Sequence, residues 1–112
     1  MERLYEFELV DILRNLDGIV LGCSAGAMIQ LEEYHISPDR DYPSFGYYNG
    51  IGWLKDFYVE VHYEGADVQD ESIHRVLADR QKPVYTTAFN RAAIAVDGGE
   101  MHLLGDVKRF DP

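Results

Sequence analysis

In residues 19–28, IVLGCSAGAM, a short apolar run is followed by a serine with a glycine two positions away on each side. Residues 19–21 are wholly apolar, as is typical of a buried strand in a parallel sheet. After the second glycine, residues 27–33 have high helix propensity. The stretch therefore predicts a strand, a tight glycine turn and a helix.

The turn matches the pattern GxSxG, with Gly22, Ser24 and Gly26 at its three fixed positions. This pattern forms the nucleophile elbow of many hydrolases, because small residues let a strand reverse sharply into a helix. In such an elbow Ser24 is the nucleophile, and the backbone N–H of Ala25 helps to stabilise an oxyanion. Small residues also mark close helix packing, so the pattern alone fits a structural role too.

Two helices and one long loop are expected outside this turn. Apolar residues recur at helical spacing in residues 2–15 and again in residues 67–80. Residues 34–52 contain prolines, glycines and several tyrosines, which indicate a long loop. Long loops in small domains are often functional.

Strands are expected in the second half of the chain. Residues 57–63 are β-branched and aromatic, and residues 83–88 have the same character. Residues 92–96 and 101–104 flank an Asp-Gly-Gly-Glu turn and predict a C-terminal hairpin. With one strand, turn and helix ahead of them, these elements predict an α/β domain with a parallel sheet.

A serine nucleophile needs a general base, usually histidine. His62 is at the end of a predicted strand, and strand ends are where sites collect in α/β proteins. His35, in the predicted loop, is a second candidate. We expect His74 and His102 to be structural or surface residues.

The base in turn needs a carboxylate that orients it. Asp39 and Asp41 lie in the predicted loop, and Glu60 lies two residues before His62 on the same face of its strand. Spacing alone does not choose among the three. We expect Glu32 and Glu33 to lie on a solvated helix face.

The composition excludes several classes of protein. The net charge is −10, and the ten Lys and Arg residues are scattered among twenty acids, so we expect no nucleic-acid partner. Apolar runs are far shorter than the roughly 20 residues of a membrane span, and no secretory leader opens the chain. Cys23 is the only cysteine, which disfavours a disulfide or a zinc site. We therefore expect a cytoplasmic protein without a metal or a membrane partner.

Three segments together resemble the C-terminal half of the peptidase E and cyanophycinase family of serine peptidases. They are GIVLGCSAGAMI, GIGWLKDFYVEVHYEG and AAIAVDGGEMHLLG, and the resemblance spans nearly the whole chain. The specific elements are the GxSAGA elbow and a histidine 38 residues after its serine. The resemblance implies a three-layer, flavodoxin-like fold of the class I glutamine amidotransferase type.

By position, the resemblance implies Ser24 as the nucleophile and His62 as its base. In the aspartyl dipeptidase branch the spacing of the acidic member points to Asp39, with Asp41 and Glu60 as alternatives. Known members hydrolyse aspartyl dipeptides or the aspartate-arginine polymer cyanophycin without a cofactor. The resemblance therefore implies a small, acidic peptide substrate. Many members have a proline before the histidine, where this chain has Val61.

Family members also carry another half before the elbow, with further strands and a second oxyanion donor. Residues 1–112 are therefore expected to form a single but partial domain that is completed by a missing N-terminal half or by a homo-oligomer. The alternative function is a non-catalytic relative that acts as an interaction or structural subunit. A cysteine-dependent, amidotransferase-like activity is disfavoured because Cys23 precedes the apex of the elbow.

Overall fold

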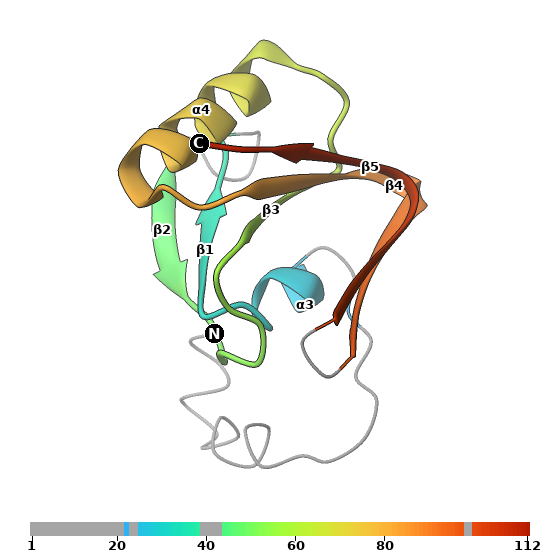
Figure 1. Cartoon of the computed structure of the whole chain (residues 1–112). Coiled ribbons are helices and arrows are strands. Elements are labelled where there is room, and N and C mark those ends of the chain that lie inside the picture. Colours follow the sequence, from blue (N-terminus) through green and yellow to red (C-terminus); the bar gives the residue numbers. More distant parts are fainter. Residues whose placement is uncertain (1–21, 23–24, 39–43, 98–99) are drawn as a thin grey trace.

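Strand β4 is the centre of the larger sheet in the computed structural model, which describes residues 22, 25–38, 44–97 and 100–112. It spans Val84–Asp97 and pairs in parallel with β3 (Tyr58–Val61) and antiparallel with β5 (Glu100–Phe110). The expected α/β character and C-terminal hairpin are therefore confirmed, whereas the described sheet is mixed and contains one parallel pair where a parallel sheet was expected (Figure 1).

Strand β4 joins two segments that the sequence predicts as separate strands. Residues 84–88 of the first segment and 92–96 of the second belong to the same strand, and its register against β5 shifts between Thr87 and Ala92. Such a shift bends a strand and increases its twist. Both strands of the hairpin accordingly curl away from β3 beyond this point (Figure 1).

A second, two-stranded sheet corrects two expectations. The predicted loop at 34–52 contains β1 (Glu33–Ile36) and β2 (Gly46–Asn49), which pair antiparallel. The predicted helix at 27–33 ends early, because helix α3 spans only Ala25–Met28. Residues beyond it instead make tertiary backbone contacts: the Glu32 N–H donates to the Leu54 carbonyl at 2.7 Å. Tertiary pairing outweighs helix propensity here.

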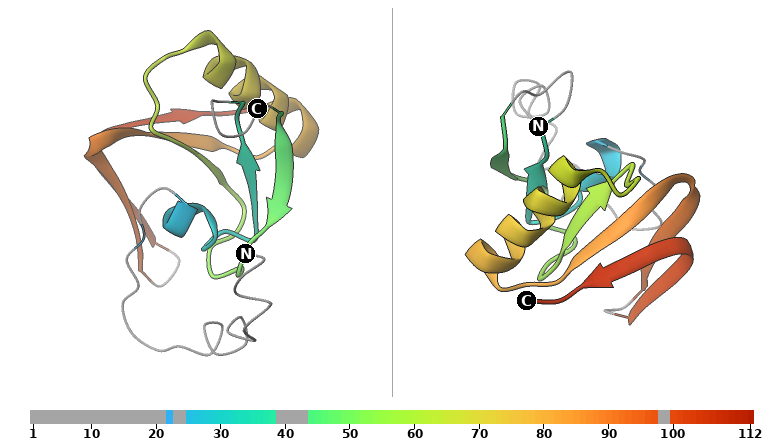
Figure 2. Two further views of the ribbon diagram at one scale, coloured as in Figure 1. Left: turned by 180° about the vertical axis from the view of Figure 1, so that it is seen from behind. Right: turned by 90° about the horizontal axis from the view of Figure 1, so that it is seen from above.

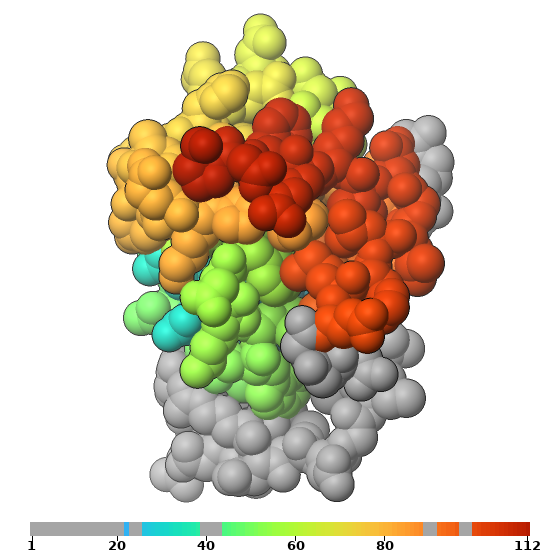
Figure 3. All heavy atoms as spheres, in the orientation of Figure 1, coloured from blue at the N-terminus to red at the C-terminus, as the bar shows by residue number. Residues whose placement is uncertain are grey.

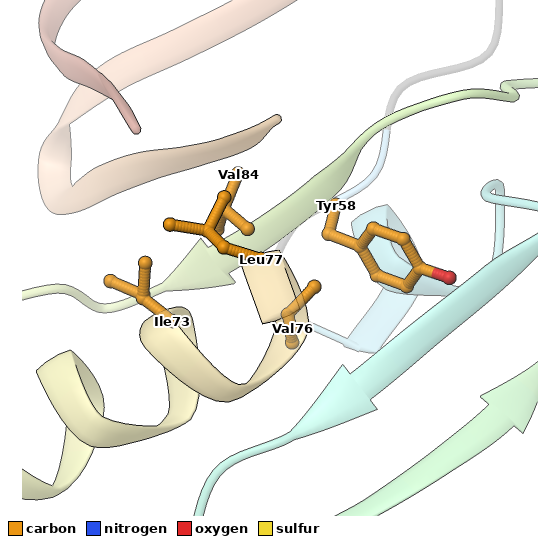
Figure 4. Packing of buried hydrophobic residues seen from close by; sticks show 5 residues of the cluster. All are labelled: Tyr58, Ile73, Val76, Leu77 and Val84. Atoms are coloured by element: carbon orange, nitrogen blue, oxygen red, sulfur yellow. The ribbon is translucent and has the colours of Figure 1, made fainter. Parts of the chain in front are cut away.

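Helix α4 spans Asp67–Arg80, as predicted from the sequence. Its buried face, with Ile73, Val76 and Leu77, packs against Tyr58 of β3 and Val84 of β4 (Figure 4). This cluster covers one face of the β3–β4 pair. Seen from above, α4 runs between the β1–β2 pair and the β4–β5 hairpin (Figure 2).

The opposite face of the β3–β4 pair is covered as well. Phe57 and Tyr85, each one residue from a member of the first cluster, pack with Leu31 and Tyr34 in a second buried cluster. Neighbouring residues on a strand point to opposite faces, so this segment is apolar on both. That explains why residues 57–63 show no clean alternation of polar and apolar residues.

Two expected elements, the helix at 2–15 and the strand at 19–21, lie outside the described residues. Within the described residues, no helix has the length and apolar character needed to cross a bilayer.

Candidate functional site

His62 lies immediately after β3, at the carboxyl end of a parallel strand. It is exposed, and its backbone adopts the left-handed conformation with φ of 52°. This conformation is uncommon outside glycine and turns the chain sharply out of the sheet. The expected position of His62 at a strand end is confirmed.

The peptide unit that follows His62 is held at both ends. The Tyr63 N–H donates to the Thr87 carbonyl of β4 at 3.0 Å, and the Gln69 side chain donates to the His62 carbonyl at 3.1 Å. The turn is therefore tied to the sheet on one side and to α4 on the other. The backbone beneath the imidazole is anchored although the ring itself is exposed.

Tyr63 adds a side-chain contact between this turn and α4. Its hydroxyl donates to the Asp70 carboxylate at 2.6 Å, and its ring packs against Phe110 of β5 with centroids 6.3 Å apart. The hydrogen bond to Asp70, with burial as a smaller cause, raises the pKa of the Tyr63 hydroxyl to about 12. The phenol therefore stays protonated over the physiological range.

Glu60 is buried, and its carboxylate contacts His35 of β1. One oxygen of its buried carboxylate lies 2.9 Å from His35 Nε2 and accepts a hydrogen bond from the Ser37 hydroxyl at 2.5 Å. The contacts link β3 to β1 and to the residue that follows β1. Burial of an ionisable residue is tolerated when it is paired and hydrogen-bonded, as Glu60 is.

His35 itself is enclosed by aromatic side chains. Its ring stacks on Phe45 with centroids 5.9 Å apart and lies near Tyr58, and only 2% of the residue is exposed. Its second nitrogen, Nδ1, has no hydrogen-bond partner in the described part of the chain. The histidine expected in a loop is thus a buried strand residue.

A second polar cluster joins the same strands to α4. Glu33 accepts hydrogen bonds from the Tyr58 hydroxyl and from Arg80 Nε, the latter at 2.7 Å. Burial alone would raise the pKa of the Glu33 carboxyl, but the contacts with Arg80 and Tyr58 outweigh it and lower the pKa. The expectation that Glu33 lies on a solvated helix face is wrong, because it lies on β1.

Part of the predicted elbow can be described. A Cβ at Gly22 would lie 2.4 Å from the Gly26 carbonyl oxygen, so no side chain fits there, whereas a Cβ at Gly26 would meet nothing within 4 Å. Helix α3 begins at Ala25. The close approach explains the glycine at position 22 and provides no comparable reason for the one at position 26.

The remaining predicted site residues, Ser24, Asp39 and Asp41, lie outside the described residues. His74 on α4 and His102 on β5 are exposed, as expected. Within residues 22, 25–38, 44–97 and 100–112, no group of three or more His, Cys, Asp or Glu side chains is arranged to hold a metal ion.

The sequence reasoning did not identify two features of this region. One is the pairing of His35 with Glu60, for which the sequence carries no local signal, because the two residues are 25 positions apart. The other is Gln69, which stands three residues after the N-cap residue Ala66, in the position of a capping-box glutamine.

No protein-family model, curated protein or solved structure matches the chain.

Proposed function

We propose that the chain is a serine peptidase resembling peptidase E, with Ser24 as nucleophile and His62 as general base. The observation that supports this most is the position of His62, exposed and backbone-anchored at the carboxyl end of a parallel strand. Parallel strands of α/β proteins carry their sites at this end. A three-layer fold of the class I glutamine amidotransferase type is part of the same proposal.

In the proposed reaction His62 takes the proton of the Ser24 hydroxyl while the serine oxygen attacks a peptide carbonyl. The Ala25 N–H stabilises the resulting oxyanion. The amine leaves with the proton from His62, and a water, activated by the same imidazole, releases the acyl group. No metal or organic cofactor is required, and the proposed substrates are small peptides with acidic residues.

Asp39 is the proposed orienting carboxylate, with Asp41 as its alternative. Glu60 is the third candidate, but its contacts with His35 and Ser37 direct one carboxylate oxygen into the protein. These contacts favour the two aspartates over Glu60. Alanine variants of Asp39, Asp41 and Glu60, tested in the labelling experiment described next, show which carboxylate the reaction needs.

The test is labelling of the purified chain with a fluorophosphonate probe, which reacts with activated serines. We expect Ser24→Ala and His62→Ala to abolish labelling, because one removes the nucleophile and the other its base. His74→Ala and His102→Ala are matched controls, since both remove an exposed histidine. Labelling that survives His62→Ala, or a folded wild-type chain that is not labelled, would refute the proposal.

The second candidate is a non-catalytic interaction subunit, and the β4–β5 hairpin favours it. Val96, Leu103 and Leu104 are exposed, the last with 57% of its surface accessible. Strand β5 lies across the surface of the molecule (Figure 3). Light scattering tests the candidate: self-association that Leu104→Lys abolishes supports it, and a monodisperse monomer contradicts self-association through this hairpin.

A further inference from the structure

One side chain of α4, that of Gln69, contacts the backbone of the turn that carries His62 at several points. The Gln69 side-chain oxygen accepts hydrogen bonds from the N–H groups of Glu64 and Ala66, at 3.1 and 3.4 Å. The nitrogen of the same carboxamide donates to the His62 carbonyl at 3.1 Å. Gln69 therefore contacts three backbone groups between the end of β3 and the start of α4.

The chemistry of a glutamine side chain fits these three contacts. The turn presents two N–H donors and one carbonyl acceptor, and a carboxamide is a neutral side-chain group that carries both an acceptor and a donor. Ala66 is the N-cap of α4 and its side chain makes no capping hydrogen bond. The Gln69 oxygen makes the other half of a capping box, since it accepts from the Ala66 N–H, and its nitrogen reaches the His62 carbonyl.

His62 needs such support because of its backbone conformation. A non-glycine residue in the left-handed region persists where surrounding contacts fix it. The Tyr63 N–H is held by Thr87, and Gln69 holds the carbonyl of the same peptide unit. Loss of the second contact removes the hydrogen bond that holds the His62 carbonyl to α4 and so weakens the restraint on the backbone that carries the imidazole.

We propose that Gln69 is a positioning residue that fixes the left-handed backbone of His62 and thereby the direction of its imidazole. The effect on the backbone is independent of the reaction. The effect on catalysis rests on the proposed function, in which that imidazole removes the proton from Ser24.

The discriminating variant is Gln69→Glu. A carboxylate keeps the acceptor for Glu64 and Ala66 but places an oxygen against the His62 carbonyl, where the wild type has a donor. Negative charge in the first turn of a helix is favourable, so we expect α4 to remain at least as stable. The variant thus separates the position of His62 from the stability of the helix.

Gln81→Glu is the matched control. Gln81 follows the other end of α4, roughly 20 Å away along the helix axis, and its carboxamide also donates to a backbone carbonyl, that of Ala78, at 3.0 Å. The substitution makes the same chemical change without touching the turn. Gln69→Ala, which removes all three contacts, is the second variant.

Two measurements on the full chain decide the proposal. The three-bond HN–Hα coupling of His62, which depends on φ, and the residual dipolar coupling of the Tyr63 N–H report the backbone directly. We expect both to change in Gln69→Glu and not in Gln81→Glu. The rate of fluorophosphonate labelling should fall roughly 10- to 100-fold in Gln69→Glu, because small displacements of a catalytic group are costly.

Couplings that equal the wild-type values in both Gln69→Glu and Gln69→Ala would overturn the proposal, whatever the labelling rates. A wild-type chain that is not labelled at all would refute the proposed function instead. The couplings would then still decide whether Gln69 positions His62.

Discussion

His35 and His62 lie near the same strand and are held in opposite ways. His35 is buried, and its ring is fixed by Glu60 and by the aromatic residues around it. His62 is exposed, and the contacts described above fix its backbone. A buried ring that is paired contributes to the free energy of folding, whereas the anchored backbone of His62 leaves the residue exposed to solvent. The comparison shows that fixing a residue does not require burying it.

The largest effect is expected from removing the partner of His35. Glu60→Ala leaves His35 Nε2 and the Ser37 hydroxyl buried without their acceptor. Breaking a buried pair in this way should lower the free energy of unfolding by about 3 kcal/mol. Urea denaturation measures the loss. His62→Ala, at an exposed but left-handed position, should cost no more than about 1 kcal/mol.

Glu60→Gln keeps an acceptor oxygen, so we expect it to lose less of the free energy of unfolding than Glu60→Ala does. Equal stability losses in Glu60→Ala and His62→Ala would contradict the contrast between the two histidines.

A smaller effect is expected at the cluster that ties β1 to α4. Tyr58→Phe removes one of the two donors to the Glu33 carboxylate and leaves Arg80 in place. We expect a loss of about 1 kcal/mol in the free energy of unfolding at neutral pH. Tyr48→Phe is the control, because Tyr48 is exposed, and it should be close to neutral.

The loss in Tyr58→Phe should also depend on pH. The pKa of Glu33 is lower in the folded protein than its ordinary value of 4.5. Its contribution is therefore full above pH 4.5 and disappears as the pH falls through the lower, folded value. A difference between wild type and Tyr58→Phe that stays constant down to pH 2 would contradict the role of the charged carboxylate.

The smallest effect is expected in the turn of His62. Asp70→Asn removes the charge that Tyr63 faces, so the pKa of the Tyr63 hydroxyl should fall from about 12 towards 10.0. The absorbance of the phenolate measures this titration. Asp67→Asn, on the same first turn of α4, is the control and should leave it unchanged.

The raised pKa of the Tyr63 hydroxyl also makes the stability of the fold depend on alkaline pH. Because the folded pKa of Tyr63 is raised, its contribution is present below pH 10 and is lost as the pH rises through 12. Wild type should therefore lose more stability over this range than Asp70→Asn does. An identical alkaline loss in the two proteins would contradict the contact.

The sequence predicted correctly those elements whose residues follow a single helical or strand pattern. Helix α4 has its predicted bounds, and the strand that precedes His62 lies within the predicted range. The helix predicted at residues 27–33 was wrong beyond Met28, because helix propensity is a weak preference that backbone pairing with Leu54 overrides. The β1–β2 sheet was missed because prolines and glycines dominate the composition of its surroundings.

The candidate site was predictable in part. The position of His62 at a strand end follows from a β-branched run that stops at a turn. The partner of Glu60 could not be predicted, since Glu60 and His35 are 25 residues apart and meet only when β1 packs beside β3.

The double pairing of β4 has a consequence for the order of folding. Its contacts with β5 close a short loop, since Asp97 pairs with Glu100 at the tip of the hairpin. Its contacts with β3 pair Tyr58 with Val84, and these close a much longer loop that contains the whole of α4. Local pairings form fast and distant ones slowly. The hairpin can therefore form first and serve as the template on which β3 docks, which would make the anchored turn of His62 one of the last parts of the chain to acquire its structure.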